Sequence, residues 1–209
     1  MRRPHGRLPR AVIFDIGNVL FDWQPRYLYE RLIEDDLALD IFLRDVVTRE
    51  WHFQHDAGRD FADTSAELTS RFPQHAALIA AWGPRFNETL EREVPGVVAI
   101  LKALDDAGVP LFALTNFSGE FFPPFRATRP DVFDRFRDIV VSGDERLAKP
   151  DAAIYALALD RFGLTAEEAV FIDDSPANVA GAAALGIHAL LFTDADRLRR
   201  DLVGLGLLP

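Results

Sequence analysis

Polar and acidic residues recur in this sequence directly after short apolar runs. Runs of this kind are typical of buried strands in a parallel sheet, whose carboxyl ends meet at one edge. In open α/β sheets ligands bind beyond that edge, so the residues that end the strands are the candidates for chemistry. These residues are Asp15, Thr115, Asn116, Ser142, Asp144, Asp173, Asp174, Thr193 and Asp194.

The adjacent pair Asp173 and Asp174 is the most informative of these candidates. A single carboxylate at a strand end is often explained by solubility or turn chemistry. Two carboxylates beside a third, Asp15, repel one another unless a cation lies between them. A hard divalent ion with oxygen ligands meets this need, and Lys149 is an available fixed cation. With Mg²⁺ present, the charges of the cluster sum to zero, and the cluster can receive a phosphate.

The elements that must position these residues alternate along the chain. Apolar runs predict strands at 11–14, 110–114, 138–141, 169–172 and 188–192. Apolar residues at helical spacing, with capping residues at the ends, predict helices over 95–108, 151–163 and 175–186. This alternation predicts an α/β fold with a doubly wound parallel sheet.

Residues 23–94 interrupt this alternation. They carry amphipathic helical patterns and no convincing buried strand. An insertion of about 70 residues is too long for a loop between a strand and a helix. We therefore expect a core domain of residues 1–22 and 95–209, with residues 23–94 forming a small helical domain inserted after the first strand.

The composition is that of a globular protein with an acidic surface. Hydrophobic residues make up 49% of the 209 residues, which excludes a disordered chain. The net charge of -10 argues against a nucleic-acid partner. The sequence has no Cys, which excludes thiolate catalysis and fits a reducing cytoplasm. No apolar run suits a membrane span, and we interpret the basic residues 1–10 as a solvated arm rather than a targeting segment. We expect a cytoplasmic monomer or homodimer.

Four motifs along the chain resemble those of the haloacid dehalogenase-like (HAD) hydrolases. They are Phe14-Asp15-Ile16-Gly17-Asn18-Val19-Leu20, Leu114-Thr115-Asn116, Lys149-Pro150, and residues 171–182, which begin Phe171-Ile172-Asp173-Asp174. Four motifs in the right order are far more specific than any one of them. The helical insertion after the first motif resembles members of the family that carry a C1 cap, and the fold implied is a Rossmann-like core.

The resemblance implies a Mg²⁺-dependent phosphatase acting on a small phosphorylated molecule. Asp15 is then the nucleophile, and Lys149 neutralises charge on Asp15 and the phosphate. Thr115, or its neighbour Asn116, hydrogen-bonds the phosphoryl oxygens. The implied metal ligands are Asp15, Asp173, Asp174 and the backbone carbonyl of Gly17, a contact that needs no side chain.

Gly17 departs from the family pattern. The phosphatases of the family usually carry a second Asp at this position, two residues after the nucleophile, as general acid and base. Such catalysis contributes about 10²- to 10⁴-fold to the rate. We therefore expect that turnover is slow, that it is confined to substrates with good leaving groups, or that another group assists it. The start Asp15-Ile16-Gly17-Asn18-Val19 also resembles the bacterial alpha-D-glucose-1-phosphate phosphatase subgroup. Sugar phosphates are therefore the preferred substrate class.

Two other functions stay open at this point. The 2-haloacid dehalogenases share the fold and use an Asp nucleophile without Mg²⁺. The pair Asp173-Asp174 argues against that function, because a metal-free halide site gains nothing from extra carboxylates. A HAD-fold binding protein with weakened catalysis is disfavoured by the retained Asp15 and Lys149, whereas Gly17 favours it.

Three further sets of residues have mainly structural interpretations. Residues 51–59 are either a loop that meets substrate, with Arg59 as a binding residue, or a turn between helices with a solvated Arg59 and two surface histidines. We interpret Trp23 as part of a linker. The aromatic residues are expected to pack in the core or a subunit contact, and they are Phe117, Phe121, Phe122 and Phe125.

Overall fold

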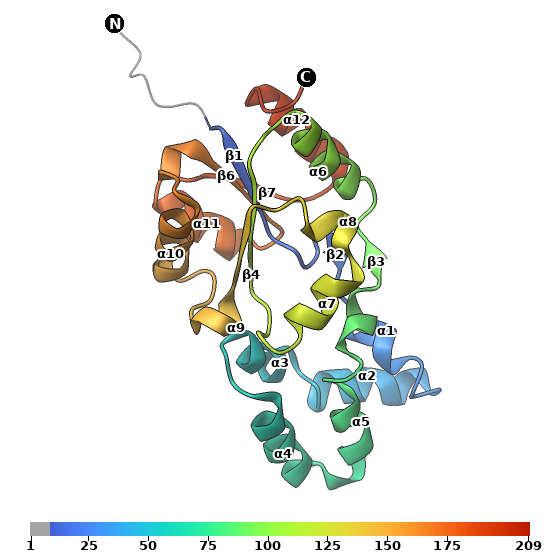
Figure 1. The fold of residues 1–209 in the computed structure, drawn as a ribbon. Helices are drawn as coiled ribbons and strands as arrows, with labels where there is room; N and C mark the ends of the chain where they lie inside the picture. The colour runs from blue at the N-terminus through green and yellow to red at the C-terminus, as the bar shows by residue number, and fades with distance from the viewer. Residues whose placement is uncertain (1–8) are drawn as a thin grey trace, which may run out of the picture.

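The computed structural model describes residues 9–209 and has an α/β fold built on a parallel sheet (Figure 1). Its strands are β1 (Ala11–Phe14), β4 (Leu111–Thr115), β5 (Asp138–Val141), β6 (Ala169–Asp173) and β7 (His188–Leu191). They pair in the order β5-β4-β1-β6-β7, with every neighbouring pair parallel. This topology confirms the predicted fold class. Residues 1–8 lie outside the described part of the chain, so the solvated arm stays a prediction for them. Of its last two residues, Pro9 is buried, contrary to that prediction, and the exposed Arg10 pairs with Glu168 at 3.1 Å.

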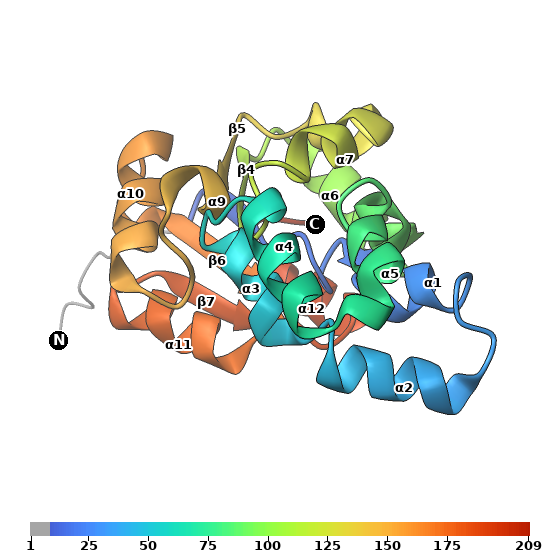
Figure 2. The same cartoon turned by 90° about the horizontal axis from the view of Figure 1, so that it is seen from below.

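The central strands are apolar because helices cover both faces of the sheet. Alternate residues of β1 enter two hydrophobic clusters: Val12 and Phe14 belong to one, Ala11 and Ile13 to the other. Because the strands are parallel, their carboxyl ends lie at one edge of the sheet, where polar side chains from different strands meet. Helices α6 (Val97–Asp106) and α12 (Ala195–Gly204) are among those that contribute to the first cluster, and α10 (Ala152–Phe162) and α11 (Pro176–Ala184) contribute to the second (Figures 1 and 2).

The chain between β1 and α6 forms a mostly helical unit, and we call residues 23–94 the inserted segment. A short antiparallel ribbon stands where this unit leaves and rejoins the core, pairing Phe21 with Glu93. The ribbon strands are β2 (Phe21–Asp22) and β3 (Arg92–Glu93). The helices are α1 (Pro25–Tyr29), α2 (Asp36–Asp45), α3 (Arg49–Asp56), α4 (Phe61–Arg71) and α5 (Ala76–Ala81), with 3-10 turns η1 (Pro73–His75) and η2 (Phe86–Leu90).

Aromatic packing and helix caps stabilise the inserted segment. Trp82 is fully buried, and its ring lies 5.9 Å from that of Tyr29 and 5.7 Å from that of Trp51. Such contacts contribute about 0.5–1.5 kcal/mol each beyond their buried area. The Thr48 side chain accepts a hydrogen bond from the Trp51 amide and so starts α3. The cap fixes which residues of α3 face inward.

The remaining elements lie between β4 and β6. They are α7 (Phe122–Thr128), α8 (Pro130–Phe133), α9 (Ser142–Glu145) and the 3-10 turn η3 (Ala166–Glu168). The phenylalanines at 117, 121, 122 and 125 are all buried, as the core interpretation requires. Within residues 9–209, the helices are too short or too polar to cross a bilayer.

Candidate active site

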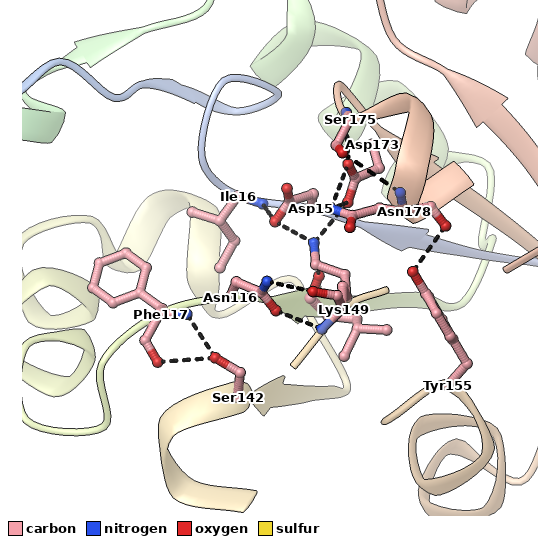
Figure 3. Close-up of polar contacts among 11 residues, drawn as sticks. Asp15, Ile16, Asn116, Phe117, Ser142, Lys149, Tyr155, Asp173, Ser175 and Asn178 are labelled. Carbon is pink, nitrogen blue, oxygen red and sulfur yellow. Dashed lines mark hydrogen bonds and ion pairs between the residues drawn. The ribbon is translucent and has the colours of Figure 1, made fainter. Parts of the chain in front are cut away.

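A buried lysine stands at the carboxyl edge of the sheet, between the ends of three strands (Figure 3). The Lys149 Nζ atom lies 2.9 Å from Asp15 Oδ1 and 2.7 Å from Asp173 Oδ2. It also donates to the Leu114 carbonyl at 3.0 Å, at the end of β4. Three acceptors therefore match the three donors of the ammonium group, which satisfies a cation that burial would otherwise destabilise.

Asp173 is hydrogen-bonded on both of its oxygens. Its Oδ1 atom accepts from the Ser175 amide at 2.8 Å and from Asn178 Nδ2 at 3.0 Å. Its Oδ2 atom accepts from Lys149. Ser175 caps α11, and Tyr155 donates to the Asn178 carbonyl at 2.8 Å (Figure 3). The start of α11 thus holds Asp173 in the orientation in which it binds Lys149.

Asp15 follows β1 and faces the same edge from the centre of the sheet. Its Oδ1 atom accepts from the Ile16 amide at 2.7 Å as well as from Lys149. Burial raises the pKa of Asp15 to about 7, although Lys149 acts in the opposite direction. Burial, with the nearby charge of Asp173, also raises the pKa of Asp174. Lys149 alone therefore leaves the negative charge of the cluster incompletely compensated.

The carboxylates of this edge fit a divalent metal ion. Asp15, Asp173 and Asp174 each offer an oxygen, and these oxygens lie within 4.8 Å of one another. An all-oxygen set with surplus negative charge suits a hard cation such as Mg²⁺. Gly17 and Asp174 also line the cavity next to Asp15. The residues implied as metal ligands are thus gathered in one place.

The second motif contributes a buried residue and a positioning residue. Thr115 ends β4 and is buried beside the site. Asn116 lines the cavity, but its amide is engaged with the backbone of Lys149: Oδ1 accepts from the Lys149 amide at 2.9 Å, and Nδ2 donates to the Lys149 carbonyl at 3.0 Å. Asn116 therefore fixes the backbone that carries the lysine. A phosphoryl-binding role for either residue stays a prediction.

A cavity of about 130 Å³ adjoins Asp15 and has walls from both the core and the inserted segment. The core supplies Asp15, Gly17, Asn18, Asn116, Phe117 and Asp174. The inserted segment supplies Trp23, His52, Asp56, Phe86 and Leu90. Whatever binds at Asp15 therefore meets side chains of both units.

In the wall that the inserted segment supplies, two predictions made from the sequence were wrong. The stretch predicted as a loop or a turn between helices is helical through Asp56, as part of α3, and His52 and His55 are buried rather than on the surface. Trp23 lines the cavity and its ring stacks on that of His52, 4.8 Å away, so it is more than a linker residue. The sequence did indicate this arrangement, because the helical spacing of four residues places them on one face of a helix. They are Trp51, His52, His55 and Asp56.

Arg59 lies away from this cavity. Its exposed guanidinium pairs with Glu67 at 2.6 Å on α4 and borders a separate surface hollow that includes Ser118 and Arg146. The structure therefore brings together Asp15, Gly17, Asn116 and Asp174 around one cavity and leaves Arg59 outside it.

Comparisons with known proteins agree with this geometry. The family model of the haloacid dehalogenase-like hydrolases matches residues 9–186. Sesquiterpene phosphatase astK of Aspergillus oryzae is 29% identical over 89% of this chain and 91% of its own. Hexitol phosphatase A of Escherichia coli is 27% identical over 93% of this chain and 89% of its own. Two further curated relatives are longer, and the chain spans 18% of one and 36% of the other.

The fold is also that of a solved structure. A HAD family enzyme from Bacteroides thetaiotaomicron, crystallised as a magnesium complex, superposes with a TM-score of 0.72 at 18% identity, covering 93% of this chain and all of its own. The chain belongs to the haloacid dehalogenase-like hydrolases. It is a hydrolase, as its motifs predicted.

Proposed function

We propose that this hydrolase is a Mg²⁺-dependent phosphatase that cleaves a small phosphomonoester through an aspartyl phosphate on Asp15. The observation that carries the proposal is the meeting of three carboxylates with one buried lysine at the edge of the sheet. This arrangement suits a group that carries several negative oxygens. Both phosphatase relatives, named for sesquiterpene and hexitol substrates, support it.

Each residue then has a distinct role in the reaction. Lys149 and Ile16 both hold Asp15 Oδ1, so Oδ2 is the oxygen that attacks phosphorus. A new bond forms between Asp15 and phosphorus while the bond to the leaving oxygen breaks, and water then cleaves the aspartyl phosphate. Lys149 stabilises the charge of the transferring oxygens. When bound by Asp15, Asp173, Asp174 and the Gly17 carbonyl, Mg²⁺ supplies further charge stabilisation.

Two substrate classes are consistent with the site. Sugar phosphates are favoured by the resemblance of the first motif and by the hexitol phosphatase relative. The monophosphate of an apolar alcohol is the second candidate, because Trp23, Phe86 and Leu90 line the cavity and the other relative is a sesquiterpene phosphatase. The core machinery at Asp15 serves both classes, since it acts on the phosphoryl group alone.

A substrate panel tests this proposal. The purified protein is assayed with p-nitrophenyl phosphate, glucose 1-phosphate, a hexitol phosphate and a prenyl monophosphate, each with Mg²⁺ and with EDTA. Chloride release from 2-chloropropionate is measured beside them. We expect phosphate release that requires Mg²⁺ and no chloride release.

The competing functions make different forecasts. Chloride release that EDTA does not affect would identify a dehalogenase. A protein that binds phosphate compounds but releases neither product would be a binding protein. Thermal unfolding adds a readout independent of turnover: Mg²⁺ at 100 times its dissociation constant stabilises by about 2.7 kcal/mol, and the Asp174→Asn variant should lose most of that gain. We further propose a cytoplasmic location and a monomeric or homodimeric state.

A further inference from the structure

We propose that Asp56, carried by α3 of the inserted segment, is the general acid and base that Gly17 does not supply. The inference rests on the proposed phosphatase function. Gly17 has no side chain to exchange a proton with the leaving group, and yet a carboxyl group from another part of the chain lines the same cavity as Asp15. The substitute therefore comes from the inserted segment rather than from the first motif.

Unpaired buried polar atoms mark the wall of this cavity. Within the described residues, five buried side-chain atoms lack a hydrogen-bond partner, and three belong to cavity residues: Trp23 Nε1, His52 Nδ1 and Asp56 Oδ1. Such atoms are rare in proteins because a buried polar atom without a partner destabilises the fold. Their gathering around Asp15 indicates a surface that a polar ligand completes. Asp56 is the carboxylic acid among them.

The surroundings of Asp56 keep its proton in place. Burial raises the pKa of Asp56 well above its ordinary value, and the charge of Asp15 acts in the same direction. Burial lowers the pKa of His52, whose Nε2 lies 3.4 Å from Asp56 Oδ2, to about 3. The other titratable groups around it are Lys149, Asp174 and His55. The raised pKa favours a protonated carboxyl beside a neutral imidazole, and a protonated carboxyl can donate its proton.

Contacts with the core hold Asp56 in position. Its backbone carbonyl accepts from Ser142 Oγ at 2.6 Å, and Ser142 Oγ in turn accepts from the Phe117 amide at 3.0 Å. Helix α3 packs against α9 at this point (Figures 1 and 2). A Cβ atom on Gly143 would lie 3.2 Å from the His55 carbonyl and 2.5 Å from the Gly119 amide, so the backbones are in close contact. The end of α3 is therefore fixed to the strand edge that carries the site.

The proton transfers balance over the two steps. As Asp15 attacks phosphorus and the bond to the leaving oxygen breaks, Asp56 gives its proton to that oxygen, which departs as an alcohol. Asp56 is then a carboxylate. It takes a proton from the water that attacks the aspartyl phosphate, so inorganic phosphate is released and both Asp15 and Asp56 return to their initial states.

The Asp56→Asn variant tests this role through the leaving group. Protonation matters greatly for an alkyl alcohol and little for p-nitrophenol. We expect kcat/KM, which reports only the step in which the leaving group departs, to fall by about 10²- to 10⁴-fold for an alkyl phosphate and to change by less than about tenfold for p-nitrophenyl phosphate. The kcat for both substrates should fall, because both share the hydrolysis of the aspartyl phosphate that Asp56 assists as a base. Asp63→Asn, an exposed carboxyl of α4, is the matched control and should leave both rates unchanged. The thermal shift caused by Mg²⁺ checks that the variant is folded and that its metal site is intact.

The outcomes separate the two proposals. An equal fall in kcat/KM for both substrates, or no fall for either, in a folded variant would overturn the role of Asp56 while leaving the phosphatase function in place. If the unmodified protein hydrolyses no phosphomonoester in the panel, the proposed function itself fails. An alkyl-specific loss supports both proposals.

Discussion

Lys149 determines the charge balance of the site at the scale of single residues. Its ammonium group is fully buried, and burial of a cation costs several kcal/mol unless close partners offset it. Asp15, Asp173 and the Leu114 carbonyl provide those partners. Although burial acts to lower it, the two carboxylates raise the pKa of Lys149 above its ordinary value, so the group stays charged.

The Lys149→Met variant tests this charge balance. Removing the cation leaves Asp15 and Asp173 without their shared partner. We expect kcat for p-nitrophenyl phosphate to fall by about 10²- to 10³-fold, the effect of losing one preorganised electrostatic group. Unfolding free energy should fall by about 3–5 kcal/mol, as for a broken buried ion pair. Lys102→Met, at the only other lysine of the sequence, is the control. A near-normal rate would remove Lys149 from the mechanism.

Gly17 offers a second test of the missing acid and base. It is not among the residues with positive φ, and a Cβ atom there would meet only Trp23 Cβ at 3.8 Å, an ordinary contact. A side chain can therefore begin at this position without backbone strain or a close Cβ contact. In the Asp56→Asn background, Gly17→Asp should restore part of the alkyl phosphate activity and raise the ratio of alkyl to p-nitrophenyl turnover. An unchanged ratio in a folded, Mg²⁺-binding double variant would contradict the proposed division of roles.

Asp56 also predicts a pH dependence of stability. Its pKa in the folded protein lies well above the ordinary 3.8. Above pH 3.8 the unfolded chain releases the proton while the folded chain keeps it, so folding loses up to about 1.4 kcal/mol per pH unit until the folded pKa is reached. The amide of the Asp56→Asn variant has no such proton. The variant should therefore gain stability relative to the unmodified protein as pH rises from 3.8 toward the folded pKa of Asp56, measured by denaturant unfolding. A pH-independent difference would refute the raised pKa.

At the scale of elements, the contact between α3 and the core decides where Asp56 lies. Ser142 joins the end of α3 to the loop after β4 through the Asp56 carbonyl and the Phe117 amide. The Ser142→Ala variant leaves both backbone groups unpaired. We expect unfolding free energy to fall by about 1–3 kcal/mol and kcat/KM to fall more for the alkyl phosphate than for p-nitrophenyl phosphate. Ser70→Ala, which removes an exposed hydrogen bond to Glu67 within α4, is the control. Equal losses for both substrates would indicate a purely structural role.

The sequence predicted the strands of the sheet but not helix α3. The strands were predicted because both faces of the sheet are covered, which makes each an unbroken apolar run such as Ala11–Phe14. Asp15 and Asp173 were then predicted as site residues, because the residues that end parallel strands lie at one edge of the sheet. Helix α3 was missed because His52 and Asp56 are polar residues that are usually exposed. Their burial depends on contacts with Trp23 and Ser142, which are distant in sequence.

At the scale of the whole molecule, the core and the inserted segment divide the chemistry. The core supplies the proposed nucleophile, the lysine and the metal ligands, whereas the inserted segment supplies the aromatic wall and the proposed acid. In the proposed mechanism, phosphoryl transfer depends on the sheet, and the choice of leaving group depends on α3 and its neighbours. Substitutions in the inserted segment should therefore alter substrate preference more than Mg²⁺ affinity.

The proposed mechanism requires a phosphorylated Asp15, and this intermediate can be trapped. The protein is mixed with p-nitrophenyl phosphate and Mg²⁺, quenched in acid within one turnover, and reduced with borohydride, which converts a phosphorylated aspartate to homoserine. Peptide mass spectrometry then locates the homoserine. We expect it at residue 15 alone, with none when EDTA replaces Mg²⁺ or in the Asp15→Asn variant. Continued Mg²⁺-dependent turnover with homoserine at another residue, or turnover by Asp15→Asn, would contradict the account.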